Sequence, residues 1–192
     1  DKKRKGAIVR KTLGQLVQKR AISPKQGALL FKIVNYFKPV HILQIGTNMG
    51  LSTLYLTSYA SGLQCIALES NPAFASVARE TFKQARNPID LREGDYTDLL
   101  PKALEDMEAV DFVYFNMQDD DICCSSLFNK CVEQTHQNSV FVFKGIKSSS
   151  KMRIAWKEIC SHPKVTVTMD LYALGIVFFN DKLHKRNYIT YY

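Results

Sequence analysis

The sequence lacks the features that mark several protein classes. None of its apolar runs reaches the ~20 residues needed to cross a bilayer, and no charged stretch followed by an apolar one opens it as in a signal peptide. Its five cysteines form no CxxC pair and its four histidines are scattered, which argues against a disulfide framework or a zinc site. These absences predict a cytoplasmic protein with reduced thiols and no membrane contact.

Positive charge is confined to the start of the chain. The 192 residues carry a formal net charge of +8, but residues 1–40 hold 11 of the 26 Lys and Arg and one of the 18 acids. We therefore expect a basic helical N-terminal cap over 1–40 and one main domain over 41–192. A basic segment can bind phosphates or simply be solvated, so nucleic-acid binding is a disfavoured alternative.

Apolar spacing predicts one helix over 7–20 and a second that begins at Pro24. Ser23 provides an N-cap and Pro24 the first helical position of the second helix, which ends before Pro39. Short apolar runs then alternate with helical stretches, as in repeated βα units with a parallel sheet. Strands are expected at 41–45, 64–68, 89–92, 111–115 and 139–143, and helices at 51–61, 72–86, 97–106, 120–136 and 149–161.

The end of the chain departs from this alternation. Strand-like runs at 164–169 and 176–179 are too close for a parallel crossover, so they predict an antiparallel hairpin. The expected fold is α/β, a Rossmann-like doubly wound sheet of seven strands, mostly parallel, with a C-terminal antiparallel hairpin and N-terminal helices. This layout is that of methyltransferases that use S-adenosylmethionine, not of nicotinamide dehydrogenases.

The turn after the first strand reads IGTNMGLST and lacks a GxGxxG motif. Asn48 stands where a pyrophosphate site needs its middle glycine. A looser polar turn between Gly46 and Gly50 suits the zwitterionic amino-acid end of S-adenosylmethionine, although a tight strand-to-helix turn would look the same. Ser52 and Thr53 would cap or line the next helix.

Acidic residues follow the next two strands. Glu69 lies 23 residues after Gly46, the offset of an acid that accepts hydrogen bonds from ribose hydroxyls; the alternative is a helix-terminal charge ahead of Pro72. After the third strand, Asp95 could contact adenine and Tyr96 could stack on it or cover it. Alternatively, Asp98 or Thr97 only caps the following helix.

These motifs, in this order, resemble class I S-adenosylmethionine-dependent methyltransferases, and among them the small O-methyltransferase group related to catechol O-methyltransferase. HILQIGTNMGLSTLYL is similar to the first motif, ALESNP to the acidic second, LREGDYTDLLPKAL to the third and VDFVYFN to the fourth. The run from Ser139 to Phe179 is similar to the closing strand, helix and hairpin. The resemblance covers residues 24–180.

The resemblance implies O-methyl transfer from S-adenosylmethionine to a small molecule (EC 2.1.1.-). The turn would hold the methionine moiety, Glu69 the ribose, Asp95 and Tyr96 the adenine, and Asn116 would face the methyl sulfonium. Positioning the nucleophile in line would supply much of the rate. The expected cofactor-binding residues are Gly46, Thr47, Asn48, Gly50, Ser52, Glu69, Ser70, Asp95, Tyr96 and Asn116.

The sequence departs from the family pattern at three positions. Gln44 replaces an acid before the glycine turn, which weakens a supporting contact. Metal-dependent members carry an Asp after the fourth strand and an acidic or Asp-Asn pair after the fifth, where this chain has Asn116 and Lys144-Gly145. Because Mg²⁺ needs carboxylates, no catalytic metal is expected. The acids 119–121 are a poor substitute for the missing ligands and are expected to start a helix.

The catalytic candidates are Asn116 and Lys144, and both assignments are open. Lys144 would act as a base or hold an anionic substrate, or would point to solvent together with Lys147 and Lys151. Met117 and Trp156 would line a substrate pocket or belong to the core.

Two functions compete with methyl transfer to a small molecule. One is a catalytically impaired member that keeps the fold as a binding or interaction module, and the other is an RNA methyltransferase guided by the basic N-terminal helix. The identity of the methyl acceptor and a homodimeric state are left open by the sequence.

Overall fold

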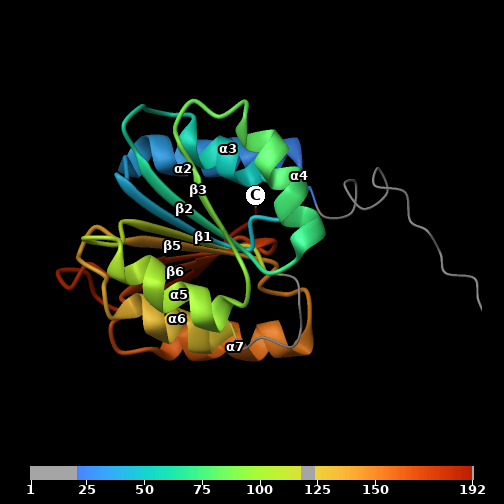
Figure 1. Cartoon of the computed structure of the whole chain (residues 1–192). Helices are drawn as coiled ribbons and strands as arrows, with labels where there is room; N and C mark the ends of the chain where they lie inside the picture. The colour runs from blue at the N-terminus through green and yellow to red at the C-terminus, as the bar shows by residue number, and fades with distance from the viewer. Residues whose placement is uncertain (1–20, 118–123, 192) are drawn as a thin grey trace, which may run out of the picture.

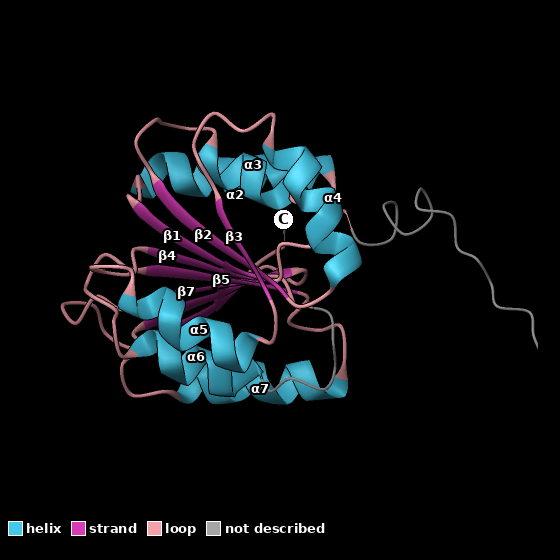
Figure 2. Ribbon diagram, in the orientation of Figure 1, coloured by secondary structure: helices cyan, strands magenta, loops and turns pink. Residues whose placement is uncertain are grey.

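The alternation of apolar runs and helical stretches produces a three-layer α/β fold in the computed structural model, which describes residues 21–117 and 124–191. One sheet lies between two helical layers: α2, α3 and α4 cover one face, and α5, α6 and α7 the other (Figures 1 and 2). Among these described residues, no helix combines the length and apolarity needed to cross a membrane. The helix predicted over 7–20 lies outside them, and the division of the chain at residue 40 stays a prediction.

Every strand and helix predicted within the described residues is present, with shifts at the ends. The strands are β1 His41–Ile45, β2 Gln64–Glu69, β3 Asp90–Glu93, β4 Phe112–Phe115, β5 Val140–Lys144, β6 Val167–Asp170, β7 Leu174–Phe178 and β8 Arg186–Ile189. The helices are α2 Pro24–Phe37, α3 Leu51–Thr57, α4 Pro72–Phe82, α5 Tyr96–Glu105, α6 Cys124–Val132 and α7 Ser150–Ser161. Of the helix predicted over 120–136, residues 120–123 lie outside the described residues.

Strand order confirms the doubly wound layout. The order is β3-β2-β1-β4-β5-β7-β6-β8, with parallel pairing from β3 through β5. β7 pairs antiparallel with both β5 and β6, which confirms the C-terminal hairpin. From β1 the chain adds β2 and β3 on one side of β1, and then β4 and β5 on its other side. The strand order therefore reverses at β1, and the switch point lies at the carboxyl end of this strand.

The expected number of seven strands is wrong, because β8 adds an eighth, parallel to β6 at the edge of the sheet. All four residues of β8 are exposed. A strand with no buried side carries neither an apolar alternation nor an apolar run, so the sequence gives no periodic signal for it.

Two apolar clusters fill the space between the sheet and the helices. Successive residues of a strand point to opposite faces, so Phe112 and Tyr114 of β4 lie in the cluster beneath α2 and α3. Val113 and Phe115 lie in the cluster beneath α5, α6 and α7. The same alternation fixes which residues at the strand ends face which helical layer.

Asp111, just ahead of β4, joins its own segment to the start of β1 and to the loop ahead of β5. It lies at the amino ends of the parallel strands, away from their carboxyl ends. Its carboxylate accepts hydrogen bonds from the amides of Val40 (2.7 Å) and His41 (2.8 Å) and lies 2.8 Å from Nε2 of His136. Burial alone would raise the pKa of Asp111, but the hydrogen bonds from the His41 amide, His136 and the Val40 amide, with the charge of His41, hold it below its usual value. The ionised form is therefore stabilised by folding.

Replacing Asp111 by asparagine is expected to lower the free energy of unfolding by about 2 kcal/mol at pH 7, because charge-assisted hydrogen bonds are lost. A lowered folded pKa gives stability that is complete above the unfolded pKa of about 4 and disappears as pH falls through the folded value. The difference between wild type and Asp111→Asn in urea unfolding should therefore shrink between about pH 5 and pH 3. Asp181→Asn, at an exposed acid, is the control. If the difference in unfolding free energy between wild type and Asp111→Asn did not depend on pH, the stabilising role of the ionised Asp111 carboxylate would be contradicted.

Candidate functional site

Three chain segments meet where the strand order reverses. They are the turn 46–50 after β1, Glu69 at the end of β2 and Asn116 after β4. We call this group the switch-point site. Open α/β sheets bind ligands in the crevice outside the strand carboxyl ends at such a reversal. The topology therefore places the sequence-predicted turn, acid and amide together.

The glycine turn is a sharp, left-handed bend. Gly46, Asn48 and Gly50 have φ values of 80°, 52° and 85°, a region that glycine and, less often, asparagine adopt without large strain. The amides of Gly46 and Thr47 both donate to the carbonyl of Leu68 at 3.0 Å. The turn is thus fastened to β2, which brings it next to Glu69.

Gln44, the residue that replaces an acid of the family pattern, is the centre of a buried polar network. Its Nε2 donates to Oγ of Ser52 (2.8 Å) and to the carbonyl of Gly46 (3.3 Å), while its Oε1 accepts from the hydroxyl of Thr53 (2.9 Å). The Thr53 hydroxyl lies 2.7 Å from that of Thr47. An amide both donates and accepts, so Gln44 joins the turn to the start of α3. The expectation that it weakens a supporting contact of the family pattern stays a prediction.

Glu69 is buried, with 3% of its surface exposed, and is directed toward the turn. Its Oε2 accepts from the amide of Asn48 at 2.6 Å and its Oε1 from the amide of Asn71 at 2.9 Å. The helix cap beside it is Asn71, whose side chain accepts from the amides of Ala73 and Phe74. Glu69 therefore orders the site by joining the turn to the segment that follows β2.

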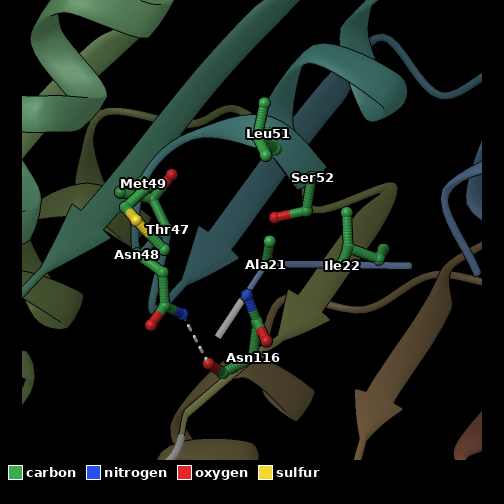
Figure 3. Close-up of a pocket in the computed structure, with 8 residues that line it drawn as sticks. All are labelled: Ala21, Ile22, Thr47, Asn48, Met49, Leu51, Ser52 and Asn116. Atoms are coloured by element: carbon green, nitrogen blue, oxygen red, sulfur yellow. Dashed lines mark hydrogen bonds between the residues drawn. The ribbon is translucent and has the colours of Figure 1, made fainter. Parts of the chain in front are cut away.

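Asn116 closes the other side of the turn. Its carbonyl accepts from Nδ2 of Asn48 at 3.1 Å, the dashed line in Figure 3. The residue is 2% exposed, and among the described residues the Oδ1 of its side chain has no hydrogen-bond partner. A buried amide oxygen without a partner costs free energy, so this atom is suited to a polar or cationic ligand.

A small pocket opens over the turn and Asn116. Figure 3 shows the side chains around it, drawn from the turn, the start of α3, Asn116 and the segment ahead of α2. Its lining residues are Ala21, Ile22, Thr47, Asn48, Met49, Leu51, Ser52 and Asn116. Sequence reasoning missed Ala21, Ile22, Met49 and Leu51, because apolar residues in a turn and before a helix carry no motif; only the proximity of Leu51 to Ser52 could have indicated one of them.

The residues after β3 take structural positions. Asp95 is the N-cap of α5: its carboxylate accepts from the hydroxyl and the amide of Thr97, which hold the pKa of Asp95 below its usual value. Tyr96 is 3% exposed and belongs to the core beneath α5. Ser70 is half-buried beside Glu69. Contact of Asp95, Tyr96 and Ser70 with a nucleoside stays a prediction.

The positions that hold a metal in metal-dependent members of the resembled group present Asn116 and Lys144. An amide oxygen next to an ammonium does not fit a divalent cation, which needs carboxylate ligands. Across the described parts of the chain, no three His, Cys, Asp or Glu residues gather in a metal-binding group; the acids 119–121 lie outside those parts. Trp156 belongs to the apolar cluster beneath α5, α6 and α7, and Met117 is partly buried against that cluster.

Comparisons with known proteins give the family of sequences to which this chain is similar. A model of a family described as O-methyltransferase matches residues 4–149. Catechol O-methyltransferase B of Danio rerio is 29% identical over 100 residues, 50% of this chain and 38% of its own length. The chain matches about two fifths of the length of its curated relatives.

Solved structures share the fold over nearly the whole chain. An O-methyltransferase from Bacillus cereus in complex with SAH has a TM-score of 0.70 at 20% identity, covering 90% of this chain and 93% of its own. TomG, an O-methyltransferase of Streptomyces achromogenes in complex with SAM, has a TM-score of 0.71 at 18% identity and covers 86% of both chains. These likenesses establish the Rossmann-like methyltransferase fold.

Proposed function

Because the chain belongs to the O-methyltransferase family, we propose that it binds S-adenosylmethionine at the switch-point site and transfers the methyl group to an oxygen of a small molecule. The observation that carries the proposal is the position of Glu69, buried at the end of β2 with its carboxylate 2.6 Å from the amide of Asn48. A carboxylate there can accept both hydroxyls of a ribose. The relatives that were crystallised with SAM or SAH support the same cofactor.

The residues of the site fit the parts of this cofactor. The left-handed turn and the Ser52 hydroxyl offer polar groups to the amino-acid end, and Glu69 offers acceptors to the sugar. The Oδ1 of Asn116, for which residues 21–117 and 124–191 provide no partner, carries partial negative charge and can face a sulfonium cation. We propose these assignments for Gly46, Thr47, Asn48, Gly50, Ser52, Glu69 and Asn116.

When bound, the cofactor supplies a methyl group that is already activated by its positive sulfur. The chain therefore has little covalent chemistry to perform; it must hold the two reactants in line and exclude water. Gln44 stiffens the turn through Ser52 and Thr53, so the geometry of the turn is set before the ligand binds. We propose that transfer proceeds without a metal, since Asn116 and Lys144 do not form a cation site.

Titration calorimetry with S-adenosylmethionine and S-adenosylhomocysteine tests the proposal, followed by transfer of a labelled methyl group to a panel of hydroxylated small molecules. We expect heat from both ligands, and product in the presence of EDTA. A chain that binds neither ligand rejects the proposal. Binding without transfer to any acceptor supports a binding module instead. Methylation of RNA that disappears at high salt would support the RNA alternative.

A further inference from the structure

The carboxyl ends of four neighbouring strands present different groups in a fixed order. From β2 through β1 and β4 to β5, these are Glu69, the turn 46–50, Asn116 and Lys144. Hydrogen-bonded strands lie about 4.8 Å apart. Lys144 is therefore the next group in line beyond Asn116, on the side away from Glu69.

Lys144 and Asn116 lie at the same level and on the same side of the sheet. Phe143 of β5 is the register partner of Phe115 of β4, and both belong to the cluster beneath α5, α6 and α7. Because strand residues alternate between faces, the residues that follow, Lys144 and Asn116, both extend toward the layer of α2 and α3. The Lys144 side chain thus extends toward the side of the sheet on which the pocket opens.

The charge of Lys144 is not balanced by the described part of the chain. The side chain is half-buried, and no acid in that part pairs with it. The nearby Lys147, in contrast, pairs with Asp170 at 3.0 Å and lies 4.8 Å from the centre of the Tyr172 ring. Burial without an opposite charge lowers the pKa of Lys144, and a bound anion would supply that charge.

We propose that the Lys144 ammonium holds the methyl acceptor by one anionic oxygen, replacing the divalent cation of metal-dependent members of the family; this rests on the function proposed above. An ammonium is a compact point charge with three N–H donors, whereas a divalent cation takes several oxygen ligands at once. The acceptor class is therefore a molecule with a single ionised oxygen, a phenolate or a carboxylate, and not a vicinal diol.

The transfer step balances without a base. The acceptor binds as its anion, and its oxygen forms the new bond to the methyl carbon. The bond from that carbon to sulfur breaks, and its electron pair stays on sulfur. No proton moves, and Lys144 remains an ammonium throughout.

Binding of 4-nitrophenolate to the full chain tests the role of Lys144 directly, with EDTA present and with or without S-adenosylhomocysteine. We expect Lys144→Met to weaken the affinity at least tenfold, Lys144→Arg to change it less than threefold, and Lys157→Met, at an exposed lysine of α7, to leave it unchanged. Benzoate in a parallel titration distinguishes a carboxylate acceptor from a phenolate. S-adenosylhomocysteine should bind wild type and Lys144→Met equally.

The outcomes separate this inference from the proposed function. If wild type binds the anions no more tightly than Lys144→Met does, the inference is overturned while cofactor binding can stand. A separate titration of wild type with catechol, with Mg²⁺ in place of EDTA, would also overturn it if catechol bound more tightly than 4-nitrophenolate. If wild type does not bind S-adenosylhomocysteine, the proposed function fails, and the titration without cofactor still decides whether Lys144 holds an anion.

Discussion

Replacing Glu69 by glutamine is expected to weaken the binding of S-adenosylmethionine about 100-fold. Glutamine replaces one carboxylate oxygen by an NH₂ group, which cannot accept from a ribose hydroxyl and faces the amide of Asn48 or Asn71 with a second donor. Hydrogen bonds to a charged group contribute about 1.5–3 kcal/mol each, and losing about 3 kcal/mol corresponds to two powers of ten. Titration calorimetry measures the change.

Glu93→Gln is a matched control, because Glu93 ends the adjacent strand β3 and is the register partner of Glu69. Its carboxylate pairs with Arg79 at 3.0 Å on the surface, where an ion pair contributes little. We expect Glu93→Gln to bind the cofactor as wild type does. Equal affinities for Glu69→Gln and wild type, with both folded by circular dichroism, would contradict the ribose assignment.

The fold was largely predictable, because most residues of its buried strands are apolar and polar residues follow the strand ends. Phe112 and Tyr114 belong to a run of four large or β-branched residues without a charge, and a strand of this kind is typical of a sheet covered on both faces. β8 was not predictable, because its side chains are all exposed and its pairing with β6 depends on the hairpin that precedes it. Apolar burial thus explains both the success and the failure.

The site was predictable where a residue's role follows from its place at a strand end, as for Glu69 and the turn 46–50. The site was less predictable where neighbouring polar side chains could form hydrogen bonds with one another. The N-cap of α5 was expected at Thr97 or Asp98. In the structure the N-cap is Asp95, whose carboxylate accepts hydrogen bonds from Thr97. The sequence also did not indicate that the amide of Gln44 joins Ser52 and Thr53. Spacing along a sequence does not show which of several polar neighbours will pair.

Replacing Gly46 by alanine is expected to lower the free energy of unfolding by about 3 kcal/mol or more and to abolish cofactor binding. The residue has φ of 80°, where an L-residue costs about 1–2 kcal/mol. A Cβ there would also lie 2.8 Å from the carbonyl oxygen of Asn116. That oxygen cannot move freely, because it accepts from Asn48 and the Asn116 amide donates to the carbonyl of Ile45 at 2.8 Å. Urea unfolding measures the effect.

Gly62→Ala separates strain from crowding. Gly62 has φ of 77°, nearly that of Gly46, but no heavy atom lies within 4 Å of the place its Cβ would take. It should therefore show the conformational cost alone, about 1–2 kcal/mol, and keep its affinity for S-adenosylmethionine. The additional loss of unfolding free energy in Gly46→Ala then measures the steric cost of placing a Cβ against the Asn116 carbonyl. If the two variants lost the same stability and both bound the cofactor, that close approach would not constrain the site.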